Sequence, residues 1–414
     1  MTDSSPPPTT ASTPSGDVGA GLDPYDAVLL LSFGGPRGPQ DVVPFLENVT
    51  RGRGIPRERL VEVGEHYFAR GGASPINGQN EALVAALRAE LSRRGLGVPV
   101  LWGNRNWDPY LVDVLRAAAA GGARRVLVVT TSAYSSYSGC RQYREDLARA
   151  LAQLASEGVE LEVDQVRRYF NTPGFVEANT DAVVAAARSL GGPEAPAPRL
   201  VFVTHSVPTA MAASSGPAGD AYVDQHRDVA AEVAARAGDA LGAPLVHDLV
   251  YCSRSGPATQ PWTEPDVNDH LEILAVGGVG AVVLAPIGFV SDHMEVVHDL
   301  DTEAAETARR LGLRFARAAT VGVADAFVRS LVDTALERAA AARTGTEVVG
   351  GRPAPAGGPQ RQAVGRLAPA HDVCAVGCCP NARADLPAAC GVDSTPPLVA
   401  TAGAGRPVTA EVSR

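Results

Sequence analysis

The stretch AVVLAPIGFVSDHMEVVHDLDTE, residues 281–303, decides the fold class of this chain. Its first part is a continuous apolar run rich in β-branched residues, which is typical of a strand covered on both faces in a parallel sheet. Its second part is dense in Asp, Glu and His, and we interpret it as a helix. A buried strand that leads directly into a helix is the repeating unit of α/β proteins.

The same alternation of short apolar strands and helical stretches continues before and after this stretch. Helices are expected at about 221–241 and 324–341, among others. The other expected strands are DAVLLLSF (26–33), VPVLWGN (98–104), RRVLVVTTSAY (124–134), LEVDQVRRY (161–169), LVFVTHS (200–206) and PLVHDLVY (244–251). This alternation predicts an α/β fold of two doubly wound, Rossmann-like domains with parallel sheets.

Shifts in composition divide the chain. The segment GGPEAPAPR, 191–199, has the composition of a linker, and the strand pattern starts again after it. We therefore predict an N-terminal domain over 24–192 and a C-terminal domain over 193–342. Their composition predicts that a disordered arm over 1–23 and a flexible tail over 343–414, which carries a cluster of cysteines, flank the two domains.

Length and charge exclude several classes of protein. The 414 residues carry a formal net charge of −10, which argues against binding to a nucleic-acid backbone, since that needs a basic face. No apolar run approaches the roughly 20 residues of a membrane span, and the N-terminus does not have the pattern of a signal peptide. We expect a cytoplasmic protein that acts as a monomer.

The acidic segment after the strand at 281–290 is the first candidate site, because ligands of open α/β sheets bind at the carboxyl ends of strands. On a helix, Glu295, Asp299 and Glu303 lie at i, i+4 and i+8 and form one stripe. Neighbouring carboxylates repel one another unless cations bind to them. Asp292 is expected to cap this helix. The alternative is a solvated helix face without a function.

His205 stands at the end of the expected strand LVFVTHS. It is either a core histidine whose ring is bound by the backbone or a site residue at a strand end. Paired with Glu295 from another strand end, it becomes a candidate for metal handling. Neutral imidazole and carboxylate suit ferrous iron or another borderline divalent cation. The chain has no compact metal motif such as HExxH, so the residues alone do not identify the cation.

Nine segments of the chain occur in the order seen in ferrochelatases. They are LLLSFGGP, FLENVTRGRG, HYFARGGASPIN, GNRNWDPY, TSAYSSYSGCRQY, VTHSVP, SRSGP, PWTEPDV and PIGFVSDHMEVVHDLD. The chain resembles this family over about 25–340, and most closely its actinobacterial members that insert iron into coproporphyrin III. The resemblance implies the chelatase fold, with a porphyrin cleft between two Rossmann-like domains. It also implies an enzyme that inserts Fe(II) into coproporphyrin III and releases two protons in haem biosynthesis.

The resemblance further implies roles for individual residues. His205 and Glu295 match the family's active-site pair, which binds Fe(II) and accepts pyrrole protons. Asp299 and Glu303 match its acidic ridge, proposed to pass metal inward or protons outward. The positions expected to contact the porphyrin are Ser74 and Tyr143, with Phe33, Arg51, Arg53 and Tyr67 as cleft neighbours. Phe33 stands where some members have a Tyr that ligates product iron, so that contact is not expected here.

Four of the six cysteines crowd into residues 374–390. In a reducing compartment such a group indicates a metal rather than disulfides. Some ferrochelatases carry a [2Fe–2S] cluster on one internal cysteine and three near the C-terminus, and a cluster needs four thiolates. The resemblance therefore implies a [2Fe–2S] cofactor with Cys390 as a substitute ligand and four favoured ligands: Cys140, Cys374, Cys378 and Cys379. Thiols without a metal are the alternative.

Other functions stay open at this level. A ferrochelatase for protoporphyrin IX, or a chelatase that inserts cobalt or nickel into another tetrapyrrole, belongs to the same class of enzyme. A haem or porphyrin carrier or an Fe–S sensor would need neither Glu295 nor the acidic stripe. On fold alone, a binding protein or a sugar transferase fits as well. The expected partners are coproporphyrin III, Fe(II) and a downstream enzyme of haem synthesis, without nucleic acid.

Overall fold

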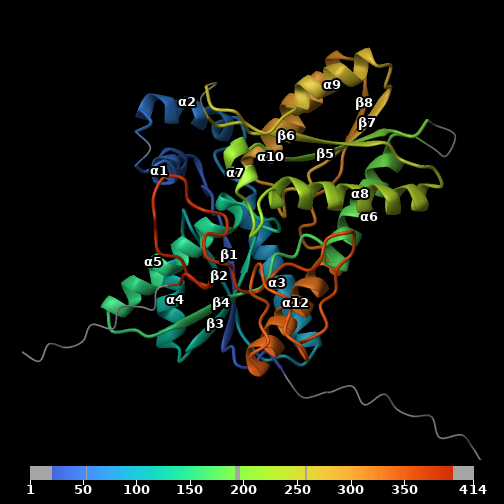
Figure 1. Cartoon of the computed structure of the whole chain (residues 1–414). Coiled ribbons are helices and arrows are strands. Elements are labelled where there is room, and N and C mark those ends of the chain that lie inside the picture. The colour runs from blue at the N-terminus through green and yellow to red at the C-terminus, as the bar shows by residue number, and fades with distance from the viewer. Residues whose placement is uncertain (1–20, 53, 192–195, 257–258, 395–414) are drawn as a thin grey trace, which may run out of the picture.

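The computed structural model of the chain describes residues 21–52, 54–191, 196–256 and 259–394. Most of the arm predicted over 1–23, the end of the tail and Arg53 lie outside these residues. Two four-stranded parallel sheets form the framework, one above the other in Figure 1. The predicted fold class, an α/β protein with two doubly wound sheets, is confirmed.

The first sheet consists of β1 (Ala27–Ser32), β2 (Val100–Asn104), β3 (Arg125–Thr130) and β4 (Glu162–Gln165). All are parallel, in the order β2-β1-β3-β4. The helices between these strands are α1 (Pro39–Val49), α2 (Arg57–Phe68), α3 (Ile76–Arg93), α4 (Leu111–Ala120) and α5 (Gln142–Ser156). A short π-helix, η1 (Tyr137–Arg141), leads into α5.

The second sheet consists of β5 (Arg199–His205), β6 (His247–Cys252), β7 (Ala281–Ala285) and β8 (Arg314–Arg317), in the order β6-β5-β7-β8. Its helices are α6 (Pro173–Ser189), α7 (Thr209–Ala213), α8 (Ala221–Leu241), α9 (Val267–Val276), α10 (Met294–His298), the π-helix η2 (Asp299–Ala304), α11 (Ala305–Arg310) and α12 (Asp325–Thr344). The helices expected at 221–241 and 324–341 are confirmed as α8 and α12. Within the described residues, no helix combines the length and the apolar composition that crossing a membrane requires.

The central strands are buried on both faces, as their continuous apolar sequences predict. Along β1, Val28 and Leu30 face one core and Leu29 and Leu31 face another, because successive side chains of a strand point to opposite faces. The core around Val28 also contains Leu200 of β5. One apolar core therefore extends across both sheets.

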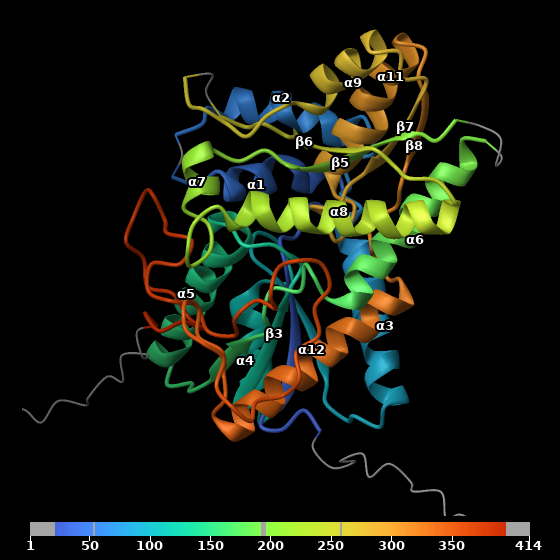
Figure 2. The same cartoon turned by 45° about the vertical axis from the view of Figure 1, so that its right-hand side comes forward.

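Helices join the two sheets as well. The last helix, α12, packs against α3 and α6, and α6 packs against α8. Figure 2 shows α8 running between the two halves, with α12 beside α3 below it. Because the halves share a core and exchange helix contacts, the domain boundaries at 24–192 and 193–342 stay a prediction.

The described part of the tail, 345–394, has no helix and only isolated strand bridges, but specific contacts hold it. Asp228 of α8, 2% exposed, accepts a hydrogen bond from the backbone N–H of Arg366 at 2.9 Å. Asp393 pairs with Arg144 of α5 at 2.7 Å. The described part of the tail, red in Figure 1, thus has an irregular backbone and packs on the body, and this packing was not predicted from its composition.

Candidate functional site

His205 is the last residue of β5, at the strand end where the sequence placed it. Contacts from α8 hold this strand end: Tyr222 Oη donates to the carbonyl of His205 at 2.8 Å. Thr204 Oγ1 lies 2.9 Å from both Tyr222 Oη and His226 Nε2. Burial lowers the pKa of His226 to about 3, so this ring stays neutral. These buried contacts hold the end of β5, and with it the backbone of His205, in a fixed position.

A hydrogen bond defines the tautomer of His205. Its Nδ1 lies 2.5 Å from the backbone carbonyl oxygen of Ser206. A carbonyl oxygen only accepts, so Nδ1 carries the proton and Nε2 of the neutral ring has a free lone pair. The side chain is 32% exposed. His205 is therefore not a core histidine bound at both nitrogens, and its Nε2 is available as a base or a metal ligand.

Glu295 faces this nitrogen from α10, the helix that follows β7. Its Oε2 lies 3.6 Å from His205 Nε2 and 3.8 Å from His293 Nδ1. Burial lowers the pKa of His293, while the charge of Glu295 acts in the opposite direction. Both distances are longer than hydrogen bonds. The three side chains thus form an open set of nitrogen and oxygen donors that a divalent cation can join.

The prediction that Asp292 caps the helix is wrong. The residue that precedes α10 is His293, and no side chain caps this helix. Asp292 instead pairs with Arg317 of β8 through two contacts of 3.2 Å, because a bidentate charged partner binds a carboxylate more strongly than a backbone N–H does. Its own N–H donates to Gln79 of α3 at 2.8 Å. The loop before Glu295 is therefore anchored to both halves of the molecule.

The carboxylates beyond Glu295 do not lie on a regular α-helix, because α10 passes directly into the π-helix η2. The wider π turn changes the i, i+4, i+8 stripe that the sequence suggested. Ser253, just after β6, donates a hydrogen bond to Asp299. Burial raises the pKa of Asp299 to about 6, and the charges of Glu295 and Glu303 act in the same direction. An acid that titrates near neutrality can take up and release protons.

Glu303 lies at the opposite end from Glu295 of the acidic ridge, which we define as Glu295, Asp299 and Glu303. Its Oε1 is 3.3 Å from His298 Nε2. The ligand atoms of His298, Asp299 and Glu303 all lie within 4.8 Å of one another. The ring of His66, on α2, packs at a tilt of 36° against that of His298, with ring centroids 3.7 Å apart. The first half of the chain thus contributes a side chain to the Glu303 end of the ridge.

Two of the expected porphyrin positions belong to one aromatic group. Phe33 and Tyr67 both pack on Phe45, at ring-centroid distances of 6.2 and 6.3 Å. Burial and, secondly, the charge of Glu295 raise the pKa of Tyr67 well above its usual range, so Tyr67 lies near the acidic ridge. Phe33 is 36% exposed, which leaves part of its ring open to a flat ligand.

Tyr143 and Ser74 are buried. The Arg105 guanidinium lies 4.5 Å from the ring centre of Tyr143 and 5.7 Å from that of Phe33. Arg105, which sequence reasoning missed, therefore connects two of the expected porphyrin positions. Ser74 packs on the turn after β1, since a Cβ added at Gly35 would lie 2.7 Å from the Ser74 Cβ.

Four buried cysteines form a separate group, which we call the thiol cluster. Its members, each at most 6% exposed, are Cys140 of η1 and three residues of the tail, Cys374, Cys378 and Cys379. Hydrogen bonds with Cys374 and Cys379 hold the pKa of Cys140 well below its usual range, and the charges of Arg168 and Arg144 act in the same direction. Cys140 therefore favours thiolate, the form that binds metals. In contrast, hydrogen bonds with neighbouring thiols raise the pKa values of Cys374, Cys378 and Cys379.

Cys390 does not belong to the thiol cluster. Its Sγ–H donates to the carbonyl of Val163 in β4 at 3.4 Å, and it packs on the core beneath that strand. The four members of the thiol cluster match the four thiolates that a [2Fe–2S] cluster requires. The residues present thus fit the cofactor without Cys390.

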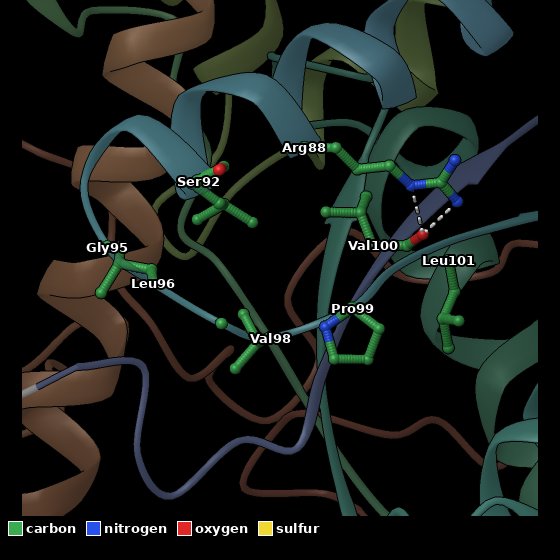
Figure 3. Close-up of a pocket in the computed structure, with 10 residues that line it drawn as sticks. Arg88, Ser92, Gly95, Leu96, Val98, Pro99, Val100 and Leu101 are labelled. Atoms are coloured by element: carbon green, nitrogen blue, oxygen red, sulfur yellow. Dashed lines mark hydrogen bonds between the residues drawn. The ribbon is translucent and has the colours of Figure 1, made fainter.

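The hollow in Figure 3 lies away from these groups. It has a volume of about 490 Å³ and lies between the end of α3 and the start of β2, whereas His205 and Glu295 follow the carboxyl ends of their strands. Among its lining residues only Arg88 is charged, and this side chain donates to the carbonyl of Val100 at 2.7 Å. A hollow without convergent polar groups offers no place for metal or proton chemistry.

Fold and site together define a class of protein: an α/β protein that brings imidazole and carboxylate groups to its strand ends, where they can hold a divalent cation and take up protons. The sequence pattern of the family described as Ferrochelatase matches residues 25–339. This chain belongs to the ferrochelatase family.

Relatives named coproporphyrin III ferrochelatase are similar over most of the chain. The one from Streptomyces coelicolor is 56% identical over 377 residues, which cover 90% of this chain and 97% of the relative. The one from Streptomyces griseus is 55% identical with the same shares, and the one from Leifsonia xyli is 50% identical over 87% of this chain and 92% of the relative. Because residues 1–339 are fewer than 90% of the 414, the first similarity extends into the tail.

Sequence reasoning included His293 in the segment dense in ionisable groups but gave it no individual role, and it missed Ser253. Ser253 directly follows the end of a strand, so the strand-end rule could have found it. Arg51 is exposed beyond α1, where its charge acts on the hydroxyl of Tyr110. The described contacts do not bring Arg51 to His205.

Proposed function

We propose that this protein inserts Fe(II) into coproporphyrin III to form Fe–coproporphyrin III, with release of two protons, as a step of haem biosynthesis. The observation that carries the proposal is the pair of His205 Nε2 and Glu295 Oε2, which face each other at 3.6 Å beyond two strand ends. Membership of the ferrochelatase family and the names of the relatives support the choice of metal and porphyrin.

His205 and Glu295 are the proposed catalytic residues and the inner ligands of the substrate Fe(II). Metallation has to remove two pyrrole protons and replace water around the cation. The free lone pair of His205 Nε2 can accept a proton or bind the cation, and the Glu295 carboxylate can do either beside it. Both side chains are open, at 32% and 51% exposed, so the substrates can reach them.

Asp299 and Glu303 are the proposed relay for protons and iron. Asp299 has a pKa of about 6, which suits an acid that passes protons on at neutral pH. Glu303 and His298 lie at the other end of the ridge from Glu295, and their mixed oxygen and nitrogen donors suit a borderline cation such as Fe(II). We propose that iron moves along the ridge towards Glu295 and that protons move away from it.

For the porphyrin, we propose contacts with Phe33, Tyr67, Ser74 and Tyr143. The exposed part of the Phe33 ring and the position of Tyr67 near Glu295 support this placement. Arg51 and Arg53 are proposed to meet the propionate groups of the ligand, because guanidinium binds carboxylate in two-bond geometry. Arg53 lies outside the described residues.

The proposal includes a [2Fe–2S] cofactor on Cys140, Cys374, Cys378 and Cys379. When bound, such a group supplies one-electron redox chemistry and four metal–thiolate bonds. The burial of four thiols at one place supports it. A reducing cytoplasm, the proposed location, keeps such thiols free of disulfides.

The remaining parts of the proposal concern organisation. We propose a monomer with the two domains 24–192 and 193–342, and the acidic net charge of −10 supports the absence of a nucleic-acid partner. A downstream enzyme of haem synthesis is the proposed acceptor of the product.

Anaerobic incubation with Fe(II) and coproporphyrin III, followed by absorption spectroscopy of the porphyrin, tests the function. We expect the purified protein to convert the free-base spectrum to that of the iron porphyrin. His205→Ala and Glu295→Gln should lower the rate by at least about 100-fold, the scale of a lost general base. Porphyrin binding, measured by fluorescence titration, should change little. Full activity in either variant would contradict the assignment.

Matched controls separate the alternatives. Glu272→Gln removes a carboxylate of α9 that pairs with Arg310, and this variant should keep full activity. Protoporphyrin IX in place of coproporphyrin III decides which porphyrin is preferred, and Co(II) or Ni(II) in place of Fe(II) decides the metal. A carrier or a sensor would bind the porphyrin without metallating it.

A further inference from the structure

Arg168, a buried arginine beside the thiol cluster, has no carboxylate partner among the described residues. Arg168 is 5% exposed. Its Nη1 donates to Thr130 Oγ1 at 2.8 Å, to the Ser132 carbonyl at 3.0 Å and to the Gly139 carbonyl at 3.2 Å. Gly139 directly precedes Cys140, the member of the thiol cluster on η1. All three acceptors are uncharged, so the hydrogen bonds hold the guanidinium in place without neutralising it.

The neighbouring arginine shows what is missing. Arg167, equally buried, has a carboxylate partner in Glu337 at 2.7 Å. In the part of the chain that the structure describes, no carboxylate oxygen lies within 4.0 Å of a guanidinium nitrogen of Arg168. A buried charge without a counter-charge is strongly unfavourable. We therefore expect the charge of Arg168 to be balanced by an anion other than the described carboxylates.

Arg144 of α5 has one carboxylate partner, but one of its donors has no partner among the described residues. Its side chain is fully buried. Its Nε donates to the Ala389 carbonyl and its Nη2 to Asp393 at 2.7 Å, but Nη1 has no partner among the described residues. Asp393 is shared with Arg141, at 2.6 Å. Arg141 also pairs with Glu145 at 3.3 Å, but Nη1 of Arg144 stays free among the described residues.

The thiol cluster is the group that both arginines have in common. Arg168 and Arg144 are the two cations whose charges act on Cys140. Four neutral thiols would supply no negative charge. Four thiolates that bind two ferric ions and two sulfides carry a net charge of minus two. Such a group supplies the missing anion.

We propose that Arg168 and Arg144 are the counter-charges of an anionic metal–thiolate group in the thiol cluster, and that Arg168 sets its reduction potential. This inference rests on the proposed [2Fe–2S] cofactor. One electron from an external reductant takes the group from a net charge of minus two to minus three, with no bond made or broken. A fixed positive charge nearby stabilises the reduced form more than the oxidised form, so the arginines raise the potential.

The test compares Arg168→Gln with Arg168→Lys in the full-length protein purified anaerobically. Gln keeps an N–H donor for the surrounding oxygens but has no charge, whereas Lys keeps the charge. Titration with dithionite, followed by the electron paramagnetic resonance signal of the reduced cluster, gives the midpoint potential. We expect reduction of the Gln variant to be at least tenfold less favourable, a shift of about 59 mV to more negative potential for one electron. Lys should restore most of the shift.

Arg167→Gln is the matched control, because it removes a buried guanidinium that already has a carboxylate, and it should leave the potential unchanged. An unchanged potential in Arg168→Gln overturns the role of Arg168. If Gln prevents cluster assembly while Lys permits it, the need for charge is supported. If both variants lose the cluster, geometry rather than charge is required, which overturns the inference for Arg168, and Arg144→Gln then repeats the measurement at the second counter-charge.

The inference and the proposed function can fail separately. A wild-type protein without iron and acid-labile sulfide overturns the proposed cofactor, and with it the counter-charge role. Insertion of iron into the porphyrin is measured independently of that result. A wild-type cluster with an unshifted potential in Arg168→Gln and Arg144→Gln overturns the counter-charge role alone.

Discussion

At the scale of single residues, Asp299 shows how burial prepares a group for its proposed task. Its pKa rises from the ordinary 3.8 to about 6 in the folded protein. The folded state therefore binds more protons than the unfolded state between these values, and stability that is present below pH 3.8 is lost as the pH rises through 6. The loss amounts to at most about 3 kcal/mol.

Asp299→Asn removes this titration. We expect its free energy of unfolding to exceed that of the wild type by about 1–3 kcal/mol at pH 7.5, and to match it near pH 4. Urea unfolding at the two pH values measures the difference. Asp269→Asn, at an exposed position on α9, is the control and should show no such change. Equal pH dependence of the Asp299→Asn and wild-type proteins would mean that burial does not raise the pKa of this carboxyl.

Site residues at strand ends could be predicted from the sequence, whereas site residues contributed by distant segments could not. His205 and Glu295 could be singled out because an apolar run shows where a strand ends. Arg105 and His66 could not, because their contacts with Tyr143 and His298 arise only when distant segments fold together. Asp292 was misassigned because its partner, Arg317, lies on another strand.

At the scale of elements, the site depends on a close approach between β5 and the turn after β7. A Cβ added at Gly288 would lie 2.1 Å from Thr204 Oγ1 and 2.8 Å from the Thr204 Cα. Thr204 directly precedes His205, so any side chain at Gly288 has to displace the strand end that carries the imidazole. Glycine is required here for space rather than for an unusual backbone angle.

Gly288→Ala should therefore impair both stability and catalysis. We expect a loss of about 1–3 kcal/mol in the free energy of unfolding, as for other overpacked sites, and a fall of roughly tenfold or more in the rate of iron insertion because His205 moves. Gly280→Ala, just before the amino end of the same strand, is the matched control, since nothing lies within 4 Å of a Cβ there. Wild-type activity in Gly288→Ala would show that the exact position of the strand end does not matter.

Most regular elements were predictable from the sequence, and irregular helices were not. Seven of the eight strands and α8 follow from apolar runs and helical spacing, whereas β8, Arg314–Arg317, has no such run and was missed. The π-helices η1 and η2 were missed because their residues have the same spacing of apolar side chains as an α-helix, and the extra residue in the turn is settled by tertiary contacts. Both carry proposed functional residues, Cys140 and Asp299.

At the scale of the whole molecule, the tail connects parts of the chain that are far apart in sequence. Asp393 pairs with Arg144 in the first half. Asp228 in the second half accepts the N–H of Arg366, and Cys379 Sγ accepts the N–H of Gly216 at 3.1 Å. Composition predicted a flexible tail and not its attachment, because the attachment depends on single polar contacts and on a few scattered apolar residues, such as Val364 and Leu367, that pack on the core.

Loss of the thiol cluster should therefore loosen the whole tail. We expect the wild type, purified anaerobically, to be red-brown with visible absorption bands, and Cys374→Ser to be colourless with a melting temperature lower by about 1–2 °C, which for a chain of this length corresponds to roughly 1–2 kcal/mol. Limited proteolysis should then cut within residues 345–394.

Cys390→Ser is the matched control. The Cys390 thiol bonds to Val163 instead of the cluster, so colour and resistance to proteolysis should persist in this variant. A colourless Cys390→Ser variant would show that Cys390 is a ligand in place of one of the four proposed cysteines. A colourless wild type would contradict the proposed cofactor. A coloured Cys374→Ser variant that still resists proteolysis would show that Cys374 is not required to hold the tail.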